Sequence, residues 1–139
     1  FSEPHHTPLG HYPVHVRFSD VDAYGHVNNV KYFEYFQEAR IALLGRVGGR
    51  EDVAALPMVV AQSDLVYRRP ILFRPEAYDV QTWIPRMGRT SVVMEAEILD
   101  GGEMLSRSRF AMVFVDPATG RATEPPAELR RRLEELSKD

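Results

Sequence analysis

The sequence predicts an α+β fold in which an antiparallel five-stranded sheet wraps around one long central helix, with a short helix near the C-terminal end. A strand-like segment of alternating apolar and polar residues comes first, and a longer segment follows with apolar residues at three- and four-residue intervals. Four more strand-like segments, separated by turn residues, precede the last helix. This order suits a single sheet packed against one main helix.

The first strand is predicted because every second residue from Tyr12 is apolar and faces one side of a sheet. The alternating residues are Tyr12, Val14, Val16 and Phe18. If this register continued, Asp20 and Asp22 would share the inner face. Strand geometry is expected to break between residues 20 and 25, so the extrapolation is only a hypothesis.

The central helix is predicted from about Asn28 or Asn29 to about Leu44. Asn is a favourable helix N-cap, and Gly45 with the pair at 48–49 is a credible stop signal. The apolar positions that recur at helical spacing are Val30, Tyr32, Phe33, Phe36, Ala39, Ile41, Leu43 and Leu44. They cover a broad face of the helix.

The remaining strands are predicted by apolar alternation between turn signals. They span residues 58–67, 78–85, 90–99 and 104–115, with a hairpin signal at 100–102 and a turn cluster at 116–120. Within the third of these strands, apolar residues alternate with Glu95 and Glu97, so one face is expected to be largely dry. Pro126 then opens a short helix with Leu129, Leu133 and Leu136 on one side.

Length and composition bound the organisation of the chain. A chain of 139 residues with 44% hydrophobic residues has enough apolar side chains for one core. Residues 1–10 lack periodicity and are expected to form a flexible lead-in, so a single domain is expected over residues 11–139. A sheet of this kind exposes edge strands, and pairing with a second copy would cover one, so a homodimer or homotetramer is expected.

Several classes of function are excluded or disfavoured by composition. The net charge of −3, with acids and bases spread along the chain, argues against nucleic-acid binding, and no apolar run approaches the roughly 18 residues of a membrane span. The absence of cysteine excludes disulfides, thiolate nucleophiles and iron–sulfur clusters. The first residues lack a signal-peptide pattern, so a cytoplasmic protein without membrane partners is expected.

The segment from Phe18 to Tyr32 concentrates polar residues between the first strand and the helix. A helix start presents backbone N–H groups without intrahelical partners and the positive end of the helix dipole, which together stabilise a forming oxyanion. Gly25 permits a tight turn and close approach of a ligand. Asp22 lies a few residues upstream, and a carboxylate facing such donors suits cleavage of an activated acyl group such as a thioester.

Each residue of this segment also has a purely structural interpretation. Asp20 or Asp22 can cap the turn or the helix, and Asn28 or Asn29 can serve only as a helix cap. A lone histidine such as His26 is often only hydrogen bonded within the fold. These alternatives stay open on spacing alone.

The combination of residues is more specific, because the segment DVDAYGHVNNVKYFEYFQEAR resembles the signature segment of hot-dog-fold acyl-CoA thioesterases of the 4-hydroxybenzoyl-CoA thioesterase type. Weaker matches lie at YRRP (67–70), MGRTS (87–91) and VDPATG (115–120), so the resemblance extends over nearly the whole chain. It implies the hot-dog fold and hydrolysis of acyl-CoA to a free acid and CoA.

The resemblance also implies roles for individual residues. The catalytic carboxylate of the family falls on Asp22, and the backbone amide that polarises the thioester carbonyl falls at or near Asn29. GHVNNVKY also looks like a stretch of plant acyl-ACP thioesterases, in which an Asp, an Asn and a His are catalytic. Asp22 and His26 match, but Tyr24 occupies the Asn position, which puts a three-residue mechanism in doubt.

Substrate contacts are expected from the same loop and from a second subunit. In the family the site lies between two subunits, so Ser63 and the run Arg89, Thr90 and Ser91 are expected to contribute from across the interface, with Arg89 on a CoA phosphate. Arg68 and Arg69 are further candidates for the phosphate, and an ordinary exposed arginine is the competing interpretation for all three. The other substrate-binding candidates are Tyr24, Gly25, Asn28 and Tyr32. For Tyr32 and its aromatic neighbours on the helix, packing in the core is the competing interpretation.

The predicted function is therefore acyl-CoA hydrolysis without a cofactor. No metal site is expected, because the histidines lack ligand-like spacing. An acyl-ACP thioesterase and a non-catalytic acyl-CoA-binding module are the alternatives, and nothing resembles the motifs of hydratases on the same fold. The sequence does not identify the acyl group. It also leaves open whether the protein is a dimer or a tetramer and whether Asp22 acts as a nucleophile or as a general base.

Overall fold

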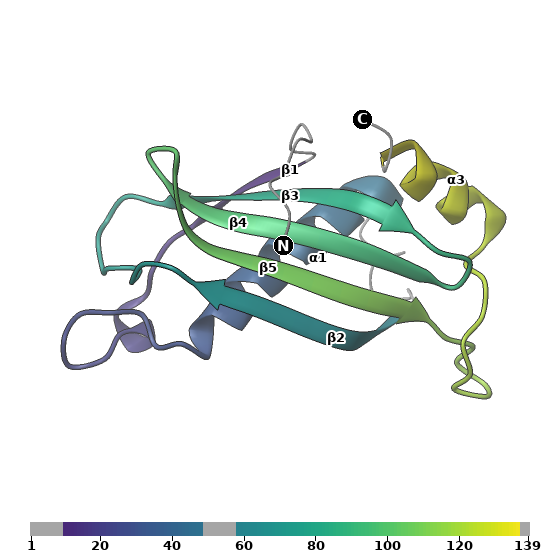
Figure 1. Cartoon of the computed structure of the whole chain (residues 1–139), viewed down its shortest axis with the longest axis horizontal. Coiled ribbons are helices and arrows are strands. Elements are labelled where there is room, and N and C mark those ends of the chain that lie inside the picture. Colours follow the sequence, from purple (N-terminus) through teal and green to yellow (C-terminus); the bar gives the residue numbers. More distant parts are fainter. Residues whose placement is uncertain (1–9, 49–57, 137–139) are drawn as a thin grey trace.

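The structure is a computed structural model that describes residues 10–48 and 58–136 of the chain. Figure 1 shows one sheet with a long helix crossing behind it and a second, shorter helix at its upper edge. The elements are β1 (Gly10–Val14), a 3-10 turn η1 (Phe18–Asp20), α1 (Lys31–Gly48), β2 (Met58–Tyr67), β3 (Tyr78–Met87), β4 (Ser91–Asp100), β5 (Glu103–Phe114) and α3 (Ala127–Leu136). The expected lead-in lies outside the described residues, except that Gly10 already belongs to β1.

The five strands form one antiparallel sheet in the order β1-β3-β4-β5-β2. The strands that follow α1 in the chain therefore form the centre of the sheet and one edge, and β2 is that edge. The long helix on one face and the short C-terminal helix confirm the predicted architecture.

The core lies between α1 and the facing side of the sheet. Tyr32 and Phe36, one turn apart on α1, are almost completely buried. Complete burial of a side chain of this size contributes about 2 kcal/mol. Their fully buried neighbours in the core include Ile71, Val80, Ile84, Val92, Ile98 and Phe114.

On the opposite face of the sheet, polar side chains of neighbouring strands cover the glutamates of β4. The alternation in β4 predicts one dry face, yet Glu95 and Glu97 on the other face are each only 9% exposed. Arg107 on β5 lies opposite Glu97 and donates to it from Nε at 2.9 Å. Trp83 on β3 donates to Glu95 at 2.9 Å. Cross-strand partners therefore cover these glutamates, which the pattern of a single strand cannot reveal.

The predicted hairpin, turn cluster and C-terminal helix are confirmed. Gly101 and Gly102 have φ of 57° and 87°, as a two-residue turn between β4 and β5 requires. In the turn after β5, the Asp116 carbonyl accepts from the Gly120 N–H at 2.7 Å. In α3, Leu129 and Leu133 are buried.

Two boundaries near the loop differ from the prediction. β1 ends at Val14, and Phe18 is 80% exposed. The 3-10 turn at residues 18–20 redirects the chain, so Asp20 is buried while Asp22 is exposed, and the prediction that they share a face is wrong.

The helix α1 begins at Lys31 rather than at Asn28 or Asn29, and it continues past Gly45 to Gly48. The difference at the start arises because the Lys31 N–H donates to the Asn28 carbonyl, three residues back, so a turn precedes the first regular α-helical turn.

Within residues 10–48 and 58–136, neither helix has the length and apolar character needed to cross a membrane.

Candidate active site

A pocket of about 430 Å³ opens between the loop before α1, the first turn of α1 and the end of β2. In Figure 1 the same three segments meet at the lower left, where β2 ends beside the start of α1. Five of the residues that the sequence predicts for the site line the pocket: Asp22, His26, Asn28, Asn29 and Tyr32. The fold therefore brings most of the predicted loop residues to one cavity.

Asp22 both shapes the loop and lines the pocket. Its Oδ1 accepts from the backbone N–H groups of Tyr24 at 2.9 Å and His26 at 3.1 Å. The Asp22 N–H donates to the His26 carbonyl at 2.8 Å, which closes the turn. Gly25 has φ of 78°, a conformation that glycine adopts without strain. Among the described residues no hydrogen bond or ion pair engages Oδ2, so one carboxylate oxygen keeps its acceptor capacity.

Three neighbouring groups fix the peptides around Asn28 and Asn29. The Asn28 N–H donates to the Asp20 carbonyl at 2.8 Å, and the Asn28 Oδ1 accepts from the Val30 N–H at 3.3 Å. The Tyr67 hydroxyl donates to the Asn29 carbonyl at 3.2 Å. In the described part of the chain, no oxygen accepts from the Asn29 N–H. A donor without a partner therefore stands at the positive end of α1, in the wall of the pocket.

His26 lines the pocket without a hydrogen bond between its ring and Asp22 in the described residues. Its ring lies beside that of Tyr24, with centroids 6.5 Å apart, and Tyr24 is itself 85% exposed. The structure therefore places an imidazole at the pocket but does not assemble a hydrogen-bonded Asp–His pair. Tyr24 and Gly25 belong to the loop but do not line the cavity.

Tyr32 forms the inner wall rather than an exposed contact. It is 2% exposed, and its hydroxyl accepts from the Ile71 N–H at 3.1 Å. Burial raises the pKa of the Tyr32 hydroxyl. Tyr32 thus belongs to the core and to the pocket wall together, so both interpretations of this aromatic residue apply.

Ser63, Arg89, Thr90 and Ser91 lie away from the pocket within one chain. Ser91 pairs with Val113, which pairs with Val59 near the start of β2, whereas the pocket lies at the end of β2. Arg89 is highly exposed and lies 3.5 Å from Glu124. A single chain therefore does not bring these four residues to Asp22.

Five more residues line the pocket: Val27, Tyr67, Arg68, Arg69 and Pro70. Of these, the sequence suggested only Arg68 and Arg69, as alternative contacts for a CoA phosphate. Four of them form the YRRP segment, which in the sequence is only a weak supporting match. Tyr67 also stacks edge-on against Tyr32, with ring centroids 4.9 Å apart. Arg69 is engaged by Glu103 at 3.1 Å. The YRRP match could be found in the sequence, but the segment begins 38 positions after Asn29, so the sequence did not show that these residues line the same pocket.

No group of three or more His, Cys, Asp or Glu residues within the described ranges is arranged to hold a metal ion. The charged and titratable side chains that line the pocket are one carboxylate, one imidazole, two tyrosine hydroxyls and two guanidinium groups.

Comparisons with known proteins agree with this architecture. The family model described as the thioesterase-like superfamily matches residues 16–133. The long-chain acyl-CoA thioesterase FadM of Escherichia coli K12 is 26% identical over 129 residues, which cover 90% of this chain and 97% of FadM. A thioesterase from Thermus thermophilus, solved in complex with coenzyme A and Zn, superposes with a TM-score of 0.80 at 31% identity, covering 91% of this chain and 92% of that one.

The PA5185 protein of Pseudomonas aeruginosa PAO1 is similar as well, with a TM-score of 0.79 at 32% identity over 93% of this chain and 92% of that one. The family match covers most of the chain, and the solved thioesterase shares its sheet and helix arrangement over the same range. The chain therefore belongs to the thioesterase-like superfamily and is a thioester hydrolase with the hot-dog fold.

Proposed function

We propose that this chain hydrolyses acyl-CoA thioesters to a free acid and CoA, with Asp22 as the acting carboxylate and the Asn29 N–H as the donor that polarises the thioester carbonyl. The observation that carries the proposal is that one pocket holds an exposed carboxylate together with a backbone N–H, in the turn just before α1, that has no acceptor in the described residues. The similarity to FadM and to a thioesterase that binds coenzyme A supports CoA as the carrier.

The proposed chemistry needs little equipment. The Asn29 N–H stabilises negative charge on the carbonyl oxygen as the acyl carbon becomes tetrahedral. Asp22 either attacks that carbon, which gives an acyl-aspartyl anhydride that water then hydrolyses to the free acid and the Asp22 carboxylate, or it removes a proton from a water that attacks the carbon directly. The carbon–sulfur bond then breaks, and the thiolate of CoA departs and takes up a proton. Single-turnover hydrolysis in ¹⁸O-labelled water tests the covalent route, because water that attacks the Asp22 carboxyl carbon of the anhydride leaves an unlabelled Asp22 oxygen in the product and puts the label on Asp22.

We assign supporting roles to other pocket residues. His26 contacts the reacting end of the substrate, and Asn28 and Gly25 hold the loop that presents Asp22. Tyr32 bounds the acyl group. At the rim, Arg68 makes no ion pair within the described residues, so its guanidinium is available for a CoA phosphate.

We further propose that the site is completed by a second copy of the chain. β2 is an edge strand with exposed Val59, Val60, Val66 and Tyr67, and an unprotected apolar edge pairs readily with another strand. Antiparallel pairing of β2 with the partner's β2 would bring the start of one strand beside the end of the other. Ser63 and the turn from Arg89 to Ser91 would then approach the pocket of the neighbouring subunit, with Arg89 and Arg68 both near the CoA phosphates.

The direct test is the Asp22→Asn variant in a thiol-release assay with short, medium, long and aromatic acyl-CoAs. The Asn side chain keeps an Oδ1 that accepts from Tyr24 and His26, so the turn is retained while the charge is lost. We expect kcat to fall by about 100-fold or more, because general-base or nucleophilic groups contribute at that scale.

Asp116→Asn is the matched control, since Asp116 Oδ1 accepts from the Ala118 N–H at 2.8 Å in a similar turn outside the pocket. Full activity of Asp22→Asn would contradict the assigned role. Tight acyl-CoA binding by the wild-type protein without thiol release would instead favour a binding module. Faster release from acyl-ACP than from acyl-CoA carrying the same chain would reassign the carrier.

A further inference from the structure

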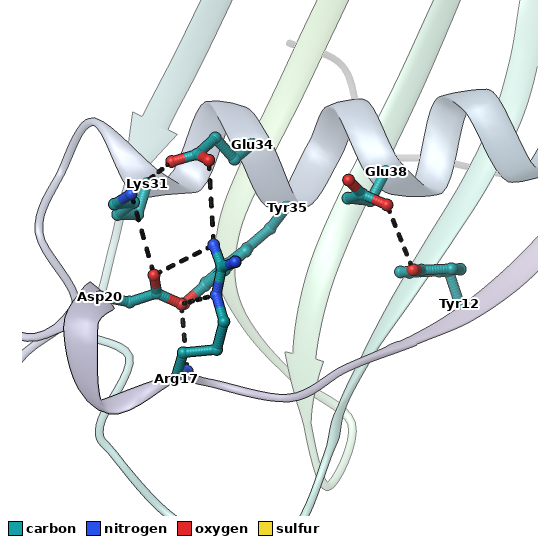
Figure 2. Close-up of polar contacts among 7 residues, drawn as sticks. All are labelled: Tyr12, Arg17, Asp20, Lys31, Glu34, Tyr35 and Glu38. Atoms are coloured by element: carbon teal, nitrogen blue, oxygen red, sulfur yellow. Dashed lines mark hydrogen bonds and ion pairs between the residues drawn. The ribbon is translucent and has the colours of Figure 1, made fainter.

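The buried carboxylate of Asp20, two residues before Asp22, is the centre of a polar cluster beside the pocket. It is 0% exposed and does not line the pocket. Its Oδ2 accepts from the Tyr35 hydroxyl at 2.7 Å and from the Arg17 N–H at 3.1 Å. Figure 2 shows the carboxylate between the Arg17 guanidinium and the two α1 residues Lys31 and Tyr35.

The same carboxylate is also held by two cations. Oδ1 lies 3.3 Å from the Arg17 guanidinium and 3.9 Å from Lys31 Nζ, and Glu34 Oε2 lies 2.9 Å from the same Lys31 nitrogen. Burial alone would raise the pKa of Asp20, but the hydrogen bonds from Tyr35 and Arg17 outweigh it and hold the pKa below its ordinary value. Asp20 is therefore ionised at neutral pH inside the fold.

The main chain of Asp20 connects this cluster to the pocket. Its carbonyl accepts from the Asn28 N–H at 2.8 Å, so Asn28 and the next residue, Asn29, are held against the loop. Asp20 thus bonds to α1 through its side chain and to Asn28, before α1, through its carbonyl. Asp22, which lines the pocket, follows Asp20 by only two residues along the chain.

We propose that Asp20 and Tyr35 are positioning residues that set the distance between the Asp22 carboxylate and the Asn29 N–H. The proposal rests on the proposed function, because it assumes that these two groups act on one thioester carbonyl. Neither Asp20 nor Tyr35 touches the substrate. Their hydrogen bond joins the loop to the second turn of α1, and loss of this bond lets the acid and the donor drift apart.

The test is the Tyr35→Phe variant, which removes one hydroxyl and keeps the ring in the core. A misplacement of about 1 Å costs on the order of 100-fold in rate. We expect kcat for acyl-CoA hydrolysis to fall by about 10- to 100-fold and KM to change by less than about twofold. Calorimetric titration with CoA should still find a full complement of binding sites at the assay temperature.

The matched control is Tyr12→Phe. The Tyr12 hydroxyl donates to Glu38 Oε2 at 3.4 Å, so this pair also bonds a tyrosine to an acid, as Figure 2 shows, but it joins β1 to α1 and does not involve the loop. We expect wild-type kcat and KM for this variant. If Tyr35→Phe loses activity only in proportion to lost CoA-binding sites, the residue is merely structural and the proposal is overturned.

A second variant covers the case in which Tyr35→Phe does not fold. Arg17→Gln removes the guanidinium that pairs with the Asp20 carboxylate, and Arg17 is a largely exposed side chain. We expect kcat to fall by about 3- to 10-fold at unchanged KM. Wild-type kcat in both Tyr35→Phe and Arg17→Gln, with Asp22→Asn inactive, would overturn the positioning role while leaving the proposed function intact. Absence of thiol release by the wild-type protein would instead refute the proposed function itself.

Discussion

Asp20 and Asp22 stand two residues apart and differ in their surroundings in almost every respect. Asp20 is fully buried and accepts from a tyrosine and from Arg17, whereas Asp22 is exposed and accepts from two backbone N–H groups of its own turn. A carboxylate that is completely buried cannot also meet a substrate. The environment therefore gives the two acids different roles: Asp20 is enclosed in the fold, and Asp22 is the accessible acid that we propose to react.

The buried acid makes stability depend on pH in a predictable direction. The folded-state pKa of Asp20 is lowered, so its contribution to stability is present above the unfolded-state pKa of about 4 and is lost as the pH falls through the lower folded-state value. We expect Asp20→Asn to lower the free energy of unfolding by about 2 kcal/mol at pH 7, the scale of a hydrogen bond to a charged group.

Urea unfolding of wild type and Asp20→Asn between pH 7 and pH 3 measures this effect. The gap between the two proteins should stay constant down to about pH 5 and shrink below about pH 4, because Asp20 of the unfolded wild-type chain then takes up a proton while the folded protein, whose Asp20 pKa is lower, still keeps the carboxylate ionised. A gap of the same size at pH 3 and pH 7 would show that the charge of Asp20 does not contribute.

At the scale of elements, the start of α1 is fixed by side chains from three parts of the chain. Asn28 accepts from the Val30 N–H, Tyr67 at the end of β2 donates to the Asn29 carbonyl, and Lys31 faces Asp20. The helix tip is therefore held from the loop, from the sheet and from its own first turn. These contacts suit the role that we propose for the Asn29 N–H, because such a donor is effective when it is in place before the substrate arrives.

The cap at this helix start can be tested by stability. Asn28→Ala removes the acceptor for the Val30 N–H, and a lost helix cap costs about 1 kcal/mol. We expect the midpoint of thermal unfolding to fall accordingly, and kcat to fall with it because Asn29 is adjacent. Asn28→Ser is the control, since a serine hydroxyl also caps helices. Equal stability of the Ala and Ser variants would show that the cap contributes nothing.

The other notable element is β4, whose two faces are both largely buried. Glu95 and Glu97 lie opposite arginines on β5, so each glutamate has a cross-strand partner. A glutamate in a strand is usually expected to face solvent. Only the pairing between strands shows that these two are covered by Arg107, Arg109 and Trp83.

At the scale of the whole molecule, assembly and activity are expected to depend on the same edge. Val60 on β2 is 45% exposed, and the proposed pairing buries it. We expect Val60→Asp to shift the protein to a monomer in sedimentation or light scattering. The rate of thiol release should fall in proportion to the loss of dimer, because residues of the partner subunit are proposed to complete the site.

Ile41→Lys is the matched control, because Ile41 is 43% exposed on α1 and lies outside β2. This variant should keep both the assembly and the activity of wild type. A monomeric Val60→Asp protein with full kcat would contradict the contribution of a second copy to the site. A dimeric and fully active Val60→Asp protein would place the interface elsewhere.

Local patterns were enough to predict the positions of the strands along the chain, the central and C-terminal helices, and the glycine turn at 101–102. These features depend on periodicity and backbone preference. The same patterns pointed to the loop that contains Asp22 and Asn29. Periodicity is a property of neighbours along the chain, so no tertiary contact is needed to detect it.

Contacts between distant segments set which acid is buried, where α1 begins, and that Tyr67 reaches the Asn29 carbonyl from 38 residues away. Burial and hydrogen bonding depend on which segments meet in space, and the 3-10 turn after Arg17 separates two aspartates that a continued strand would have kept together. The role of a carboxylate depends on its exposure to solvent and on the donors around it. Folding determines both, because it brings together parts of the chain that are distant in sequence.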